Sequence, residues 1–123
     1  MYDVSLVKER LGQIRDALLR IQNRFSAINS PEDFEFNDSN RDKLDAIAMM
    51  LIVVGESFKK IDKETGGKLL SLYPQIDWKG VKGVREVLAH DYFDIDMEEI
   101  YKICLKDVPA LLDVVQGIFR EIK

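Results

Sequence analysis

The chain has 123 residues, a length typical of a single domain with its own core, and we therefore expect one domain over residues 1–123. Its hydrophobic content of 46% and charged content of 33% exclude a disordered or fibrous protein and describe a globular one. The formal net charge of −4 argues against a protein that coats nucleic acid non-specifically, but it leaves room for a local basic site.

The cysteine content and the length of the apolar runs bear on whether the protein is cytoplasmic, secreted or membrane-bound. Cys104 is the only cysteine, so an intramolecular disulfide is impossible, and its apolar neighbours predict an inert core thiol. The first ten residues lack the long apolar region of a secretory signal. The most apolar run, residues 46–54, is far shorter than the roughly 20 residues that cross a bilayer. We therefore expect a cytoplasmic protein without a membrane segment.

The first predicted element is a long amphipathic helix. Apolar residues recur at alternating spacings of three and four, which places them on one stripe that suits packing against a partner helix. These residues are Val4, Val7, Leu11, Ile14, Leu18, Ile21, Phe25 and Ile28. Asp3 is the predicted N-cap, and residues 29–31, ending in proline, are the predicted end.

A second helix is predicted from about residue 41 to residue 63. Residues 31–40 are rich in turn formers and acidic residues, so we expect a loop there, with Asp38 or Ser39 as the cap of the helix. Between residues 46 and 54, apolar side chains cover almost the whole helical circumference. Either this is a central core helix or it also contributes to a subunit interface, and the pattern favours neither.

The rest of the chain also shows helical patterns and no convincing strand. After a break at Thr65-Gly66-Gly67, we expect a short helical turn over residues 68–72 and helices over residues 78–90 and 97–105. Asp96 is a predicted cap, and Asp107 followed by Val108-Pro109 is the predicted start of a final helix to Ile122. The predicted fold is an all-α antiparallel bundle of four to five main helices plus a short helical turn.

The residues best suited to catalysis lie between Arg85 and Tyr92. His90 is the only histidine, and histidine, with an ordinary pKa of about 6.5, is the side chain suited to moving protons near neutral pH. On a straight helix, His90 would lie about 140° from Arg85 around the axis. The two converge only if the helix ends near His90 or if two copies of the chain contribute to one site. A histidine that merely complements a helix end is the alternative.

Basic and acidic residues near this segment allow two weaker hypotheses. Lys79, Lys82 and Arg85 recur every third residue and form either a phosphate-binding track or an ordinary solvated face. One cysteine and one histidine cannot form a zinc site. Nearby carboxylates offer ligands for a hard cation, although helix capping and solvation explain them more simply. These carboxylates are Asp91, Asp94, Asp96, Glu98 and Glu99.

A set of short segments in the chain has a distinctive order and spacing. They are Val54-Gly55-Glu56, Tyr73-Pro74-Gln75-Ile76-Asp77-Trp78, Gly83-Val84-Arg85, and the run from Val87 to Phe93 followed by Ile95-Asp96. Together they resemble the signature of HepT-like proteins with a HEPN domain, and the match in order extends from the first predicted helix to the last. Members of that family usually carry Asn or Asp directly after the arginine, whereas this chain has Glu86.

The resemblance implies a single HEPN-like domain that forms a symmetric homodimer, with the Arg85 and His90 motifs of two subunits meeting in a cleft. It implies a metal-independent endoribonuclease without a cofactor, acting as a toxin in the cytoplasm of a prokaryote. The implied partner is a minimal nucleotidyltransferase antitoxin, which silences the toxin by transferring AMP to Tyr92. Glu56, Glu86 and Asp91 are the candidate neighbours of these residues in the cleft.

The side chains agree with this chemistry. His90 is suited to moving a proton at the 2′-hydroxyl or leaving oxygen of RNA, and Arg85 to stabilising charge on the scissile phosphate. AMP on Tyr92 would add negative charge that repels an RNA backbone. Two alternatives remain open: a non-catalytic helical module that binds nucleotide or a nucleotidyltransferase, and a purely structural dimer.

Overall fold

The computed structural model describes residues 2–88 and 95–122. Within these ranges the chain forms helices and no β-strand, which confirms the all-α prediction. The α-helices are α1 (Val4–Phe25), α2 (Asp38–Glu64), α3 (Trp78–Lys82), α4 (Val84–Leu88), α5 (Met97–Lys102) and α6 (Val108–Glu121). Two 3₁₀ helices, η1 (Pro31–Glu35) and η2 (Leu70–Leu72), and one π-helix, η3 (Ile103–Asp107), complete the described elements.

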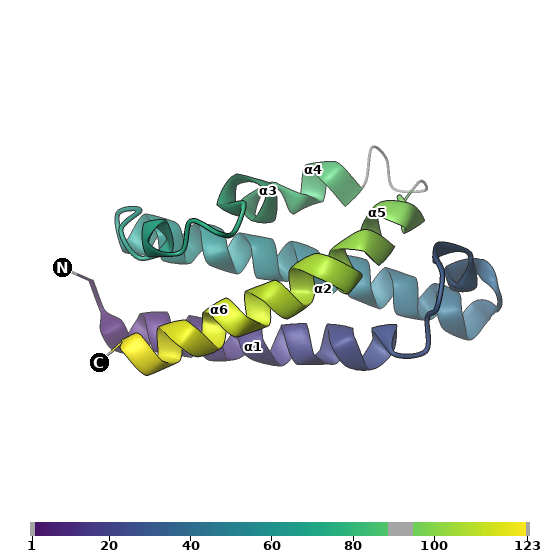
Figure 1. Cartoon of the computed structure of the whole chain (residues 1–123), viewed down its shortest axis with the longest axis horizontal. Coiled ribbons are helices and arrows are strands. Elements are labelled where there is room, and N and C mark those ends of the chain that lie inside the picture. Colours follow the sequence, from purple (N-terminus) through teal and green to yellow (C-terminus); the bar gives the residue numbers. More distant parts are fainter. Residues whose placement is uncertain (1, 89–94, 123) are drawn as a thin grey trace.

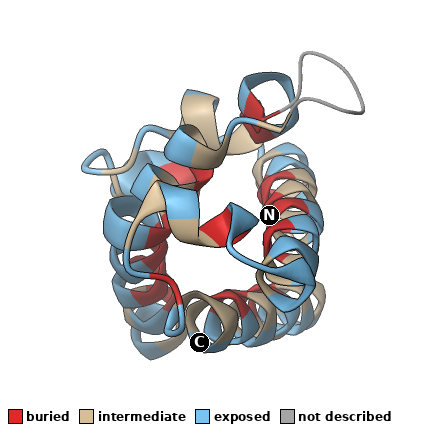
Figure 2. Cartoon of the chain, turned by 90° about the vertical axis from the view of Figure 1, so that its right-hand side faces the viewer, coloured by how far each residue is buried: buried red, intermediate tan, exposed pale blue. Residues whose placement is uncertain are grey.

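The two long helices α1 and α2 run antiparallel and form the base of the bundle (Figure 1). Helix α6 crosses them at an angle, while α3 and α4 lie on the side of α2 that faces away from α1 (Figure 1). The buried residues converge on the interior that these helices enclose (Figure 2). None of the described helices has the length and hydropathy needed to span a bilayer.

Helix α1 confirms the predicted apolar stripe but ends earlier than expected. Its five central stripe residues, from Val7 to Ile21, are buried, and the Asp3 carboxylate accepts a hydrogen bond from the Leu6 amide at 3.1 Å, as predicted for the cap. The helix ends at Phe25, before the predicted boundary at residues 29–31. Ile28 is still buried, because a turn after the helix folds it back onto the core.

Helix α2 is a central helix that contacts α1, α3, α4, α5 and η1. Its cap is Asn37, whose side chain accepts a hydrogen bond from the Asn40 amide at 2.8 Å, so the prediction of Asp38 or Ser39 as the cap is wrong. The expected loop before it contains η1, which buries Phe34. Met49 and Val53 on α2 remain 62% and 49% exposed, so the central position does not cover its whole circumference.

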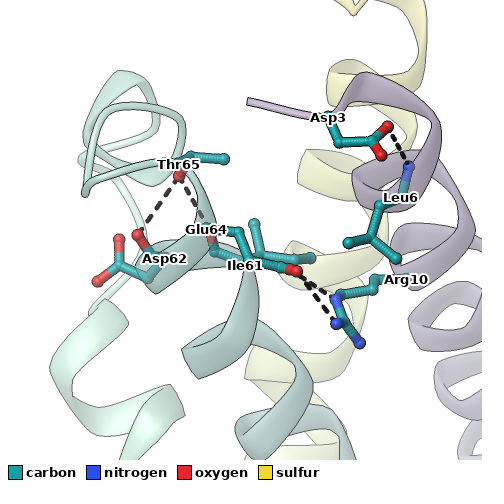
Figure 3. Close-up of polar contacts among 7 residues, drawn as sticks. All are labelled: Asp3, Leu6, Arg10, Ile61, Asp62, Glu64 and Thr65. Carbon is teal, nitrogen blue, oxygen red and sulfur yellow. Dashed lines mark hydrogen bonds and ion pairs between the residues drawn. The ribbon is translucent and has the colours of Figure 1, made fainter. Parts of the chain in front are cut away.

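The C-terminal end of α2 is fastened to α1 (Figure 3). The Arg10 guanidinium donates to both carboxylate oxygens of Glu64, at 2.6 and 3.1 Å. Thr65 ends the helix, and its buried hydroxyl donates to the Ile61 carbonyl at 2.9 Å. Gly66 and Gly67 then follow with φ of 62° and 76°, a conformation that glycine adopts without strain.

The predicted helix over residues 78–90 is two short helices in the described part of the chain. Gly83, with φ of −101° and ψ of 18°, separates α3 from α4. A glycine between two amphipathic turns is a weak point for helix propagation, and here its amide donates to the Lys79 and Val81 carbonyls. The predicted end at His90 lies outside the described residues.

The two predicted C-terminal helices form one helical run instead. Asp96 caps α5 as predicted, accepting from the Glu99 amide at 3.1 Å. The chain then continues through η3 into α6, and the Val108 amide donates to the carbonyl of Ile103, five residues earlier. The prediction of Asp107 as an N-cap is therefore wrong, because Asp107 has helical dihedrals and its side chain caps nothing. Pro109 lacks an amide donor, and the wider π turn precedes it.

Candidate functional site

At Gly55 of α2, residues of both α3 and α4 approach the helix closely. A Cβ atom at this position would lie 2.6 Å from the Val81 carbonyl oxygen and 3.0 Å from Cγ1 of Val84. Both distances are shorter than normal packing allows, so only glycine admits this backbone contact without a shift. Val84 is buried there. The position of α4, and so of Arg85, follows from the absence of a side chain at residue 55.

Trp78 fastens the loop before α3 to the same helix. Its indole Nε1 donates to the Tyr73 carbonyl at 2.9 Å, and its ring packs on Phe58 of α2 with the centroids 4.9 Å apart. Asp77 caps α3 by accepting a hydrogen bond from the Gly80 amide at 3.1 Å. The Tyr-Pro and Trp segment of the sequence signature therefore has a structural role, which is to hold the start of α3 on α2.

The two basic residues nearest the Gly83 break face acidic residues of α2. Lys82 Nζ lies 2.7 Å from Oδ2 of Asp62, and Arg85 Nε lies 3.7 Å from Oε1 of Glu56. Glu56 also has Lys59 Nζ at 3.7 Å, so it lies between two cations. Arg85 and Glu56 are thus neighbours in the fold, while their roles in a cleft stay predictions. Exposed pairs at such distances are weak, and solvent and phosphate compete with them easily.

The predicted basic stripe is divided by these contacts. Lys82 is partly buried and its charge is matched by Asp62. The Arg85 side chain is 67% exposed, and Lys79 is exposed without an ion pair among the described residues. Glu86 is exposed on the same short helix as Arg85. Arg85 and Lys79 are therefore the side chains of the stripe with most freedom to meet an anion.

His90, Asp91 and Tyr92 lie outside the described residues, so their predicted roles and their distances from Arg85 stay predictions. The described residues on either side of them are joined by a backbone hydrogen bond, from the Asp96 amide to the Leu88 carbonyl, at 3.2 Å. Leu88 is buried, and Ile95 packs against the core. The segment that carries the only histidine thus begins and ends at two anchored points beside Arg85.

The described residues contain no group of three or more histidine, cysteine or carboxylate side chains arranged to hold a metal ion. Among the carboxylates considered for a hard cation, Asp96 is a helix cap, while Asp91 and Asp94 lie outside the described part. Cys104 is buried as predicted, and burial raises the pKa of its thiol to about 12. At neutral pH this thiol is protonated and a poor nucleophile.

Two residues that organise the site were not singled out for these roles from the sequence. Asp62 meets Lys82 across 20 positions of the chain, so no helical spacing reveals the pair. Gly55 belongs to the recognised signature, but its close contact with Val81 depends on the tertiary packing of two helices. A glycine in the middle of an otherwise apolar helix is the one signal that points to such a contact.

Comparison with known proteins agrees with the sequence signature. Residues 9–118 match the family described as Ribonuclease HepT-like. The chain is 30% identical over 105 residues to "Putative RNase MJ0127" of Methanocaldococcus jannaschii, covering 84% of each protein. It is 31% identical over 78 residues to "Probable ribonuclease HepT" of Thermococcus cleftensis, covering 63% of this chain and 64% of that protein. No solved structure gives a significant match. The family match spans most of the chain, and the protein belongs to the HepT-like family.

Proposed function

We propose that this protein is a metal-independent endoribonuclease and the toxin of a toxin-antitoxin pair. Membership of the Ribonuclease HepT-like family and the names of its relatives support ribonuclease activity. The observation that carries the proposal is the placement of Arg85. Its exposed guanidinium lies on a helix pinned to α2, next to the anchored ends of the segment that contains His90.

In this proposal His90 and Arg85 divide the chemistry of RNA cleavage. The RNA 2′-hydroxyl attacks the adjacent phosphorus, and the bond from phosphorus to the 5′-oxygen breaks. His90 moves a proton at the attacking or the leaving oxygen. Arg85 stabilises the negative charge that accumulates on the phosphate, since guanidinium remains charged and binds two oxygens at once. Lys79 adds a weaker phosphate contact, and Glu56 lies beside the Arg85 side chain without competing strongly with phosphate for it.

The proposed assembly is a homodimer whose two Arg85 and His90 motifs share one cleft. A nucleotidyltransferase partner regulates it: the Tyr92 hydroxyl attacks the α-phosphorus of ATP, pyrophosphate leaves, and AMP remains on the tyrosine. The added phosphate carries negative charge into a site that must accept an RNA backbone, so it opposes substrate binding. The family resemblance suggests this regulation, and the chemistry of Tyr92 is compatible with it.

The catalytic roles are tested by substitution in the full-length protein. We expect His90→Ala and Arg85→Ala each to abolish RNA cleavage and growth inhibition, with circular dichroism and sedimentation unchanged. Arg41→Ala, which removes an exposed cation from the start of α2, is the charge-matched control and should cleave like the wild type. Undiminished cleavage by His90→Ala would refute the catalytic assignment.

A non-catalytic binding module for a nucleotidyltransferase is the second candidate. It is favoured by the net charge of −4 and by the Asp62 carboxylate that neutralises Lys82, because both weaken attraction to RNA. Purified protein that binds the partner but cleaves no RNA across a broad substrate panel would favour this function. For either function, AMP transfer to Tyr92 is tested by incubating the wild type and Tyr92→Phe with the partner and ATP and then measuring the mass of each protein.

A further inference from the structure

A groove of about 380 Å³ lies between α3–α4 on one side and the α5–η3–α6 run on the other, apart from the ion pairs of Arg85 and Lys82. Its lining is mainly aliphatic and comes from α2, from α3 and α4 with the loop before them, and from the α5–η3–α6 run. Its apolar members include Val54, Val84 and Leu111, which are buried, and Val81, Val87 and Ile103, which remain partly exposed. The groove is partly open to solvent, and Val87 at its α4 wall is 43% exposed.

Three carboxylates line the same groove. They come from three different places: Asp77 from the cap of α3, Glu99 from α5 and Asp107 from the π-helix η3. The pKa of Asp107 is raised, first by partial burial and then by the negative charges of Glu99 and Asp77. Lys102 and Lys106 act on Asp107 in the opposite direction but do not line the groove. Asp107 therefore lies close enough to Glu99 and to Asp77 for their negative charges to act on it.

The π-helix is the reason for this arrangement. Its extra residue in the turn interrupts the regular α-helical register between α5 and α6, and Ile103 and Asp107, at its two ends, both line the groove. Turns of this kind are frequent at functional sites. Among the described lining residues none is basic, and none of the three carboxylates forms an ion pair with another described residue. The described lining of the groove thus offers apolar contact together with carboxylates and no cation.

We propose that this groove docks an amphipathic segment of a protein partner, whose aliphatic side chains are flanked by lysine or arginine. Aliphatic groups of the partner cover the exposed parts of Val81, Val87 and Ile103, and its cations offset the negative charge of the carboxylates. An RNA backbone is disfavoured by the same negative charges. A partly open groove lined from α2 to α6 suits a protein segment better than a small enclosed ligand. This inference is independent of the proposed RNA cleavage.

The test uses the full chain and two synthetic helical peptides. One peptide has leucine on one face and lysine on the other, and the second has glutamate in place of every lysine. We expect the lysine peptide to bind with one peptide per chain at physiological salt, measured by fluorescence anisotropy, and the glutamate peptide not to bind. The double variant Glu99→Gln, Asp107→Asn should weaken binding about tenfold or more.

Two further variants separate groove binding from general attraction to an acidic protein. Ala110 is exposed and lines the groove, so Ala110→Trp should block the peptide without disturbing the core. Asp16→Asn with Asp45→Asn removes the same charge from exposed positions on α1 and α2 and should leave affinity unchanged. The proposal would be overturned if the lysine peptide did not bind, or if the control pair lost as much affinity as the groove pair. Unchanged peptide binding by Ala110→Trp, or binding of octylamine as tight as that of the lysine peptide, would also overturn it.

Discussion

Gly55 shows how one missing side chain positions a candidate site. The Val81 carbonyl occupies the space that a Cβ atom would need, and Glu56, the next residue, faces Arg85. The close contact and the ion pair therefore come from adjacent positions on one helix. Any group that pushed α3 away from α2 would also move Arg85 relative to Glu56.

We expect Gly55→Ala to lower the free energy of unfolding by about 1–2 kcal/mol, since backbone atoms must shift to accept the methyl group. Gly12→Ala is the matched control, because Gly12 also lies inside a long helix but a Cβ there has open space around it. That variant should stabilise the protein by about 0.5–1 kcal/mol through helix propensity alone. Urea unfolding of both variants checks the contrast, which an equal effect at the two glycines would contradict.

Among the elements, the end of α2 shows the clearest electrostatic contribution to the fold. The pKa of Glu64 is lowered, first because Arg10 donates hydrogen bonds to its ionised carboxylate (Figure 3). For the same reason the pKa of Arg10 is raised. This pair joins α1 to α2 close to the turn at Gly66 and Gly67, where the chain leaves the long helix.

The lowered pKa of Glu64 predicts a pH dependence of stability. A carboxyl with a lower pKa in the folded state contributes stability that is fully present above its unfolded value, and that contribution is lost as pH falls through the folded value. The wild type should therefore lose more free energy of unfolding than Glu64→Gln as pH falls from neutral into the acid range. Denaturant titrations at several pH values measure this difference. Glu98→Gln, at an exposed position on α5, should follow the wild type.

The elements differ in how far the sequence predicts them. Helix α1 was predictable because its apolar residues recur with the helical period and are buried on one face. The break at Gly83 and the π turn before Pro109 were not predicted, because the apolar spacing continues across both and a single glycine or proline does not fix where a helix stops. Asp107 illustrates the difficulty: Asp-x-Pro is typical of a helix start, yet a wider turn carries the helix through it.

At the scale of the whole molecule, the exposed basic residues are spread over several described helices, among them Lys8 on α1, Arg41 on α2 and Arg120 on α6. With a net charge of −4, long-range attraction to RNA is weak, so binding depends on a few local contacts. The candidate site is itself a prediction from residue types, resting on one histidine, a nearby arginine and the family signature, and the structure describes Arg85 but not His90. The pairing of Lys82 with Asp62 was not predictable, since it joins distant parts of the chain.

This charge distribution predicts a shallow salt dependence of RNA binding. Each phosphate contact to a single strand contributes roughly 0.7 to the slope of log affinity against log salt. Lys79→Ala should reduce the slope by about that amount, whereas Lys68→Ala, an exposed lysine before η2, should not change it. Titration of a non-cleavable 2′-O-methyl RNA at several salt concentrations gives the slope. Identical slopes for the wild type and Lys79→Ala would show that Lys79 does not contact RNA phosphate.

The spacing of the contacts along α2 has a consequence for changes in chain length. Gly55 and Glu56 meet α3 and α4 at one level, and Asp62 meets Lys82 two turns further along the helix. One residue inserted between Glu56 and Asp62 would rotate Asp62 by about 100° around the axis and away from Lys82. The number of residues between Glu56 and Asp62 therefore has to stay constant, so this stretch of α2 tolerates substitutions more readily than insertions or deletions.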